Sequence, residues 1–85
     1  MAELLKVQKF PVANIYVPAK KRTTLDQKKV DTIAESMLAS GQTTPIMVRA
    51  DGRRFVLVEG LHRLEACKAL GETQISGILV QARQG

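Results

Sequence analysis

The sequence predicts a compact α+β (α/β) domain in which a mixed β-sheet packs with two main helices. Two segments repeat apolar residues every three or four positions, which predicts helices. Short runs rich in β-branched residues precede, separate and follow them, which predicts strands. With 85 residues, 45% of them hydrophobic and 25% charged, the chain has the composition of an ordinary globular protein. We therefore expect residues 1–85 to form a single domain.

The first predicted strand covers residues 4–17, "LLKVQKFPVANIYV". Apolar residues dominate this segment, but Pro11 lies in its middle. Because proline has no N–H to donate to a neighbouring strand, the strand is expected to be broken or to lie at a sheet edge. Residues 18–24, "PAKKRTT", are polar and predict an exposed loop.

The clearest helix is predicted over residues 25–39. Thr24 is the expected N-cap, with Gln27 three residues later as its capping-box partner. The apolar positions with helical spacing are Val30, Ile33, Ala34, Met37 and Leu38. They predict a helix that is buried on one face, and Gly41 is its expected end.

A β-hairpin is predicted next, from "TPIMVRA" (residues 44–50) and "RFVLVEG" (residues 54–60), joined by Asp51-Gly52. A second helix is predicted over residues 61–70, ending at Gly71, with apolar residues at Leu61, Leu64, Cys67 and Leu70. The last predicted strand is "TQISGILVQAR", residues 73–83, which contains Gly77.

The charge balance favours an anionic partner. The chain has 13 Lys and Arg against 8 Asp and Glu, for a net charge of +5. Such a surface attracts nucleotides, nucleic acids or acidic proteins. The densest clusters are residues 20–22 and 52–54, and the other positive residues are dispersed. Charge alone therefore leaves a merely soluble basic surface as an equal alternative.

Cysteine usage and hydropathy limit the remaining classes. Cys67 is the only cysteine, which excludes an internal disulfide and a cysteine-rich zinc site. Its position on the apolar pattern predicts a small core residue. No apolar run approaches the ~18 residues that a membrane span needs, and the N-terminus lacks a signal-peptide core. We expect a cytoplasmic protein with no membrane partner, and no metal-ligating residues are assigned.

The segment "VEGLHRLEACKALG", residues 58–71, combines a glycine turn with a helix start. Gly60 allows the backbone to approach a ligand closely, and the next helix turn offers unpaired N–H groups that favour anions. His62 and Arg63 add side-chain donors, and the arginine fork suits phosphate. The pattern predicts a phosphate-binding turn. The alternative is a plain turn with Arg63 in a surface ion pair and His62 as a structural residue.

Three polar residues on the first predicted helix point to the same chemistry. Lys29, Thr32 and Ser36 are spaced three and four apart, so they form one stripe. This stripe borders the apolar face, from which an ammonium and two hydroxyls can reach into a cleft between the two helices. The alternative is that Lys29 is solvated and the hydroxyls only border the core.

The chain resembles the ParB/sulfiredoxin superfamily over most of its length. The resemblance is carried by "FPVANIYVP", "LDQKKVDTIAESMLASGQTTPIMV", "VEGLHRLEACKALGE" and "ISGILVQA", in this order and spacing. Family members bind nucleotide at a G-x-x-R turn: ParB proteins bind CTP, and sulfiredoxins and free serine kinases bind ATP or ADP. The resemblance implies nucleotide binding by Lys29, Thr32, Ser36, Gly60, His62 and Arg63.

One departure qualifies the resemblance. Sulfiredoxins carry a nucleophilic cysteine in this turn, where the present chain has Leu61. Leucine has no nucleophilic atom, which argues against repair of sulfinic acids, and Cys67 lies too far along the helix to replace it. Glu59 gives the turn an acidic-Gly-x-His-Arg form similar to that of the serine kinases. It is the candidate catalytic base or metal-binding carboxylate, or else a strand-end carboxylate near Arg63.

The leading expectation is a nucleotide-binding domain that takes ATP or CTP, with Mg²⁺, and has slow NTPase activity or none. Its role would be in plasmid or chromosome partition, or regulatory. One alternative is a non-specific DNA-binding or nuclease module, although the acidic residues near the first helix form no convincing cluster. Another is a small-molecule kinase related to the free serine kinases. A partner protein or a homodimer through exposed strand edges stays open. Full ParB proteins add a helix-turn-helix domain, so sequence-specific DNA recognition is not expected here.

Overall fold

The computed structural model describes residues 6–41 and 44–80, and the fold class agrees with the prediction. A five-stranded sheet has the order β1-β5-β3-β4-β2. The strands are β1 (Val7–Pro11), β2 (Ile15–Tyr16), β3 (Ile46–Asp51), β4 (Arg54–Glu59) and β5 (Gln74–Val80). The helices are α1 (Ala19–Arg22), α2 (Gln27–Ser40) and α3 (Leu61–Ala69), with a short 3-10 helix η1 (Val12–Asn14). Residues 4–5 and 81–83 of the predicted outer strands lie outside the described residues.

The sheet is mixed, as predicted. Antiparallel pairs join β1 to β5 and β3 to β4, whereas β3 pairs with β5 and β2 pairs with β4 in parallel. The predicted first strand is indeed broken: β1 ends at Pro11, η1 follows, and the chain continues as β2. β1 and β2 then form the two opposite edges of the sheet, where a proline is tolerated.

The segment predicted as a loop after β2 contains a short helix instead. α1 starts after Pro18, whose carbonyl accepts hydrogen bonds from the N–H groups of Lys21 (3.0 Å) and Arg22 (3.3 Å). None of the four residues of α1 is buried. Because α1 buries no side chain, its sequence has no apolar periodicity from which the helix could be predicted.

The predicted cap of the long helix is wrong by two residues. The hydroxyl of Thr24 donates to the carbonyl of Lys21 at 2.7 Å and so closes α1. Asp26 is the N-cap of α2, and its carboxylate accepts from the N–H of Lys28 at 3.0 Å. Gln27 is the first residue of α2, and its amide bonds to Asp31 within the same helix. No Thr24–Gln27 capping box forms.

The later elements agree with the predictions. The predicted hairpin of β3 and β4 forms, but its turn is Gly52-Arg53, one residue later than predicted, because Asp51 still pairs with Arg54. Gly52 has the positive φ of 63° that such turns favour. α3 ends at Ala69, one residue before the predicted end, and Gly71 follows with a φ of 77°. Gly77 lies inside β5 because the Phe10 ring packs there: an added Cβ would stand 2.9 Å from that ring.

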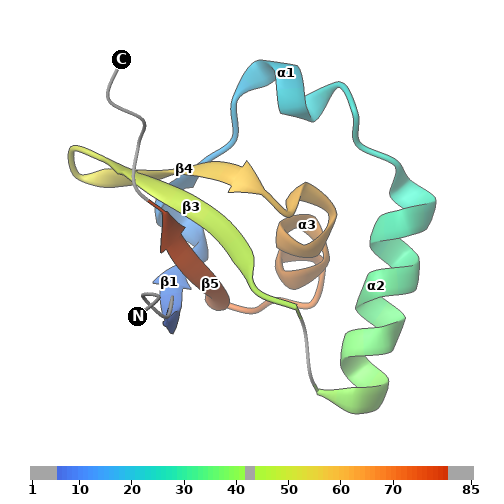
Figure 1. Ribbon diagram of the computed structural model, residues 1–85. Helices are drawn as coiled ribbons and strands as arrows, with labels where there is room; N and C mark the ends of the chain where they lie inside the picture. The colour runs from blue at the N-terminus through green and yellow to red at the C-terminus, as the bar shows by residue number, and fades with distance from the viewer. Residues whose placement is uncertain (1–5, 42–43, 81–85) are drawn as a thin grey trace, which may run out of the picture.

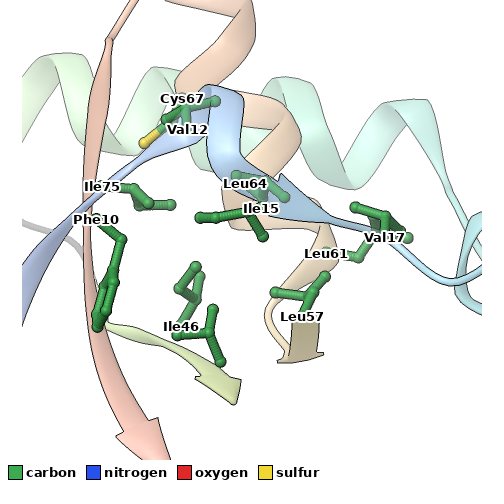
Figure 2. Packing of buried hydrophobic residues seen from close by; sticks show 11 residues of the cluster. Phe10, Val12, Ile15, Val17, Ile46, Leu57, Leu61, Leu64, Cys67 and Ile75 are labelled. Carbon is green, nitrogen blue, oxygen red and sulfur yellow. The ribbon is translucent and has the colours of Figure 1, made fainter. Parts of the chain in front are cut away.

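The molecule has three layers: the sheet, then α3, then α2 (Figure 1). The core lies between the sheet and α3, where side chains from all the strands and from α3 converge (Figure 2). Phe10 and Phe55 meet edge to face with ring centroids 4.9 Å apart. Cys67 is 2% exposed and belongs to this core, as predicted. No helix within the described residues is long and apolar enough to span a membrane.

Candidate functional site

A cleft of about 380 Å³ lies between the N-terminal halves of α2 and α3. The two helices are far apart in the sequence but pack against each other (Figure 1). The side chains that line the cleft come from both walls: Lys28, Lys29, Thr32 and Ile33 from α2, and Gly60, Leu61, His62 and Arg63 from the start of α3. The cleft thus brings together five of the six residues predicted to bind nucleotide.

The wall formed by α3 begins with a turn that requires glycine. Gly60 has a φ of 111°, and an added Cβ would stand only 2.6 Å from Cγ2 of Ile46. Gly60 is the N-cap position, and no side chain caps this end of α3. Its carbonyl accepts from Leu64 N–H at 2.9 Å, whereas the N–H groups of the first turn have no carbonyl within the helix to bond. These donors and the positive end of the helix dipole favour an anion.

The wall formed by α2 carries an unusual first turn. Lys28 and Lys29 follow directly on the N-cap and Gln27, and the first turn contains no acidic residue. Cations at this end oppose the helix dipole, at a cost of about 0.3–1 kcal/mol each at exposed sites. Both lysines line the cleft, with Thr32 almost one turn further on. The Asp26 carboxylate at the N-cap offsets part of this cost, and a bound anion would offset more of it.

His62 lines the cleft but is engaged in a hydrogen bond across it. Its Nε2 accepts from the backbone N–H of Asp26 at 3.0 Å. The structural alternative for His62 is therefore correct for this nitrogen, which cannot donate to a ligand while it accepts from Asp26.

Arg63 is half-buried and lines the cleft without a carboxylate partner. Among the residues that the structure describes, it forms no ion pair, so the surface ion-pair alternative is wrong. Glu59 is the exposed last residue of β4, lies outside the lining of the cleft and makes no ion pair with Arg63.

Ser36 is the one predicted nucleotide-binding residue that the structure does not bring into the cleft. It is exposed on α2, and its carbonyl accepts from the hydroxyl of Ser40 at 3.0 Å. Lys28, by contrast, lines the cleft and was not predicted. Its position in the first turn follows once Asp26, rather than Thr24, is recognised as the N-cap.

A larger cavity of about 500 Å³ shares Leu61 with this cleft and is lined also by Arg22 of α1. Two of its cations are already neutralised, because Arg54 pairs with Asp51 and Lys68 pairs with Glu65. The cleft between α2 and α3 offers Arg63 and two lysines with no carboxylate among its lining residues, and is the better anion site. Within residues 6–41 and 44–80, no group of three or more His, Cys, Asp or Glu could hold a metal ion.

The fold is of the kind that sulfiredoxin and ParB share. Sulfiredoxin from Arabidopsis thaliana superimposes with a TM-score of 0.80 at 26% identity, over 91% of this chain and 86% of that one. C-terminally truncated ParB from Caulobacter crescentus, complexed with CTP-γ-S, superimposes with a TM-score of 0.78 at 18% identity, over 93% of this chain and 46% of that one.

The chain belongs to the family of the ParB N-terminal domain, whose model matches residues 2–85. The chromosome-partitioning protein ParB of Myxococcus xanthus is 32% identical over 74 residues, which are 86% of this chain and 25% of the relative. The chain spans between 21% and 27% of the length of the chromosome-partitioning and nucleoid-occlusion proteins that it matches.

Proposed function

We propose that the cleft between α2 and α3 binds the phosphates of a nucleoside triphosphate, ATP or CTP. The observation that carries this proposal is the uncapped N-terminus of α3, which opens into a cleft that also holds Arg63 and Lys29. Helix N-termini favour anions through their free N–H groups and dipole. Arginine adds a charge-assisted, bidentate contact to phosphate, and lysine adds a point charge.

The comparisons support the same ligand class. A structural neighbour of the chain, Caulobacter ParB, is complexed with a CTP analogue, and the chain shares its fold and family. We therefore extend the proposal to a role in plasmid or chromosome partition, or in its regulation. Nucleotide binding would be the step that couples this domain to its partner: DNA, a partner protein or a second copy of the chain.

The cationic and hydroxyl side chains of the cleft, and the glycine turn, each receive a role in this proposal. The first-turn N–H groups of α3, exposed by Gly60, would bond phosphate oxygens together with Arg63. Lys28 and Lys29 would neutralise the phosphates from the opposite wall, and the Thr32 hydroxyl would donate to them. Ser36 would contact only a ligand that extends along α2. Mg²⁺ would enter with the nucleotide, because phosphate oxygens and water supply most of its ligands in such sites.

Glu59 is the carboxylate directly before the glycine turn, and it remains our candidate base for activating water. It is exposed and stands outside the lining of the cleft. Binding, rather than hydrolysis, is therefore the function that we propose. Phosphate release by the parent chain, measured with saturating ATP and CTP, decides whether slow hydrolysis accompanies it.

The decisive variant is Arg63→Ala. It removes a charge-assisted hydrogen bond to phosphate, worth about 1.5–3 kcal/mol, so we expect nucleotide affinity to fall at least about tenfold. Calorimetric titration with ATP, ADP and CTP, with and without Mg²⁺, measures the effect and the base preference. Lys29→Ala should weaken binding less.

The matched control is Arg53→Ala, which removes the same charge from the exposed turn between β3 and β4. Unchanged affinity in Arg53→Ala with a loss in Arg63→Ala assigns the effect to the cleft and not to net charge. If Arg63→Ala binds as tightly as the parent, the proposed site is wrong. Binding of duplex DNA that falls steeply with salt, in a chain that ignores nucleotides, would instead support the non-specific DNA-binding alternative.

A further inference from the structure

We propose that His62 is a positioning residue whose Nε2 ties the two walls of the cleft together, so that this nitrogen is not a donor to the phosphates. This inference rests on the proposed nucleotide site for its functional meaning. It differs from the expectation drawn from the sequence, in which His62 and Arg63 both contact the nucleotide. The structure separates the two neighbours: Arg63 has no ion-pair partner among the described residues, whereas His62 is bonded to the opposite helix.

The hydrogen bond reaches the residue that begins α2. The Nε2 of His62 accepts from the N–H of Asp26 at 3.0 Å, across 36 positions of sequence. Asp26 in turn holds the first turn of α2: its carboxylate accepts from Lys28 N–H at 3.0 Å, and its carbonyl accepts from Lys29 N–H, also at 3.0 Å. Asp26 therefore links His62, by hydrogen bonds, to the backbone of both lysines in the cleft.

This contact replaces half of an ordinary capping box. In a capping box, a Glu or Gln at the third helical position accepts from the N–H of the N-cap residue. The third helical position of α2 is Lys29, whose side chain only donates. His62 supplies the missing acceptor from α3. Because the acceptor comes from another helix, the third position is free to be a cation that lines the cleft.

The chemistry of the ring limits what else His62 can do. A nitrogen that accepts from an N–H cannot carry a proton itself, so the neutral imidazole has its proton on Nδ1. For Nε2 to donate to a phosphate, the bond to Asp26 would have to break and the start of α2 would lose its acceptor. Nε2 can therefore either accept from the N–H of Asp26 or donate to a phosphate, but it cannot do both.

α2 needs such a link because it is lightly packed. Val30 is its only buried residue, and Ile33 and Met37 are half-buried. α2 packs chiefly on α3 and not on the sheet. A hydrogen bond at its N-terminus therefore fixes the end of α2 at which Lys29 faces Arg63 across the cleft. Its loss should shift this wall while the sheet and α3 stay folded.

The first test needs no variant. We expect ¹⁵N NMR of the full chain, with labelled histidine, to show the Nδ1–H form of His62 and slow exchange of the Asp26 amide proton. Both signatures should persist when ATP or CTP is added. A proton on Nε2, either in the free protein or after nucleotide addition, would overturn the proposal. Because the free protein is measured first, the result stands even if no nucleotide binds.

The second test separates positioning from ligand contact. His62→Gln keeps an acceptor oxygen near the place of Nε2, whereas His62→Leu keeps only bulk. We expect His62→Leu to weaken nucleotide affinity about tenfold and His62→Gln to stay within about threefold of the parent, as the loss of one hydrogen bond predicts. An amide NMR spectrum with unchanged resonances for β3 and β5 checks that each variant is folded.

The outcomes of this test are distinct. Equal, large losses in both variants would mean that the imidazole contacts the ligand, and the positioning role would be wrong. Unchanged affinity in both variants would also contradict the positioning role of His62. If the parent itself binds no nucleotide, the proposed function fails, while the tautomer and the Asp26 amide still report on the link between the helices.

Discussion

At the scale of single residues, the turn before α3 depends on one glycine more than on any charged side chain. Gly60 has a φ of 111°, and a Cβ there would approach Ile46 to 2.6 Å. Gly71 also has a positive φ, of 77°, but a Cβ there would meet nothing within 4 Å. The two glycines therefore separate the cost of backbone strain from the cost of a clash.

We expect Gly60→Ala to destabilise the fold clearly more than its matched control Gly71→Ala. Both variants pay about 1–2 kcal/mol for an L-residue in the left-handed region. Only Gly60→Ala adds the displacement of a core side chain, about 1–3 kcal/mol more. Urea unfolding followed by circular dichroism measures both changes in the free energy of unfolding. Equal losses would mean that Ile46 moves aside freely.

Cys67 makes a prediction that depends on pH. Burial raises the pKa of its thiol, the nearby Glu72 carboxylate raises it further, and Lys9 lowers it in part. The unfolded thiol loses its proton near pH 8.5, about its ordinary value. Above that pH the unfolded chain has released a proton that the folded chain still holds, so stability falls as pH rises.

We therefore expect this part of the stability to be complete below about pH 8.5 and to shrink between there and the raised pKa of the folded thiol. Cys67→Ala lacks the titrating group, so its free energy of unfolding should fall less from neutral to alkaline pH than that of the parent. Urea unfolding of the parent and the variant at neutral and at alkaline pH measures the change in the free energy of unfolding of each. A variant that loses as much as the parent would show that the thiol is not the source.

At the scale of elements, local signals sufficed for the hairpin and for α3. Gly52 allows the turn between β3 and β4 through its positive φ, and the apolar spacing of α3 matches the face that it buries. The start of α2 was different. Thr24 and Asp26 are both good N-cap types, and the N–H of Asp26 bonds to His62, 36 residues away, a contact that no local pattern reveals.

In the candidate site, too, local signals predicted some residues correctly and not others. Lys29 and Thr32 were predicted from helical spacing, and both line the cleft. Ser36 lies on the same stripe but about 10 Å further along the helix axis than Lys29, at 1.5 Å per residue. The cleft surrounds only the first turn of α3, so the stripe leaves it before Ser36. Spacing along one helix cannot show where the partner helix ends.

At the scale of the whole molecule, the sequence indicated a mixed sheet but not its strand order. The parallel pairs β3–β5 and β2–β4 join segments that are separated by other elements. Such pairings depend on how α3 covers the sheet, which no local pattern encodes. The consequence for function is that α3 sits in the middle layer and connects the core to the cleft (Figure 1).

The three layers should differ in local stability. β3 and α3 hold fully buried residues such as Val48 and Leu64, whereas α2 buries only Val30 and rests mainly on α3. Amides protected by few buried contacts open more readily than those of the core. Hydrogen exchange followed by mass spectrometry should therefore show α2 exchanging well before β3 and α3.

Nucleotide binding should slow hydrogen exchange selectively in α2 and so reduce the difference in exchange rate between α2 and the core elements β3 and α3. A ligand held by both walls stabilises only those states in which α2 is docked on α3, so exchange in α2 should slow with added ATP or CTP in proportion to occupancy. The turn between β3 and β4, which lies away from the cleft, should be unaffected and serves as the internal control. Slowing confined to α3 would mean that the ligand contacts only the α3 wall of the cleft. In the free protein, α2 amides that exchange as slowly as those of β3 would contradict the predicted difference in stability between the layers.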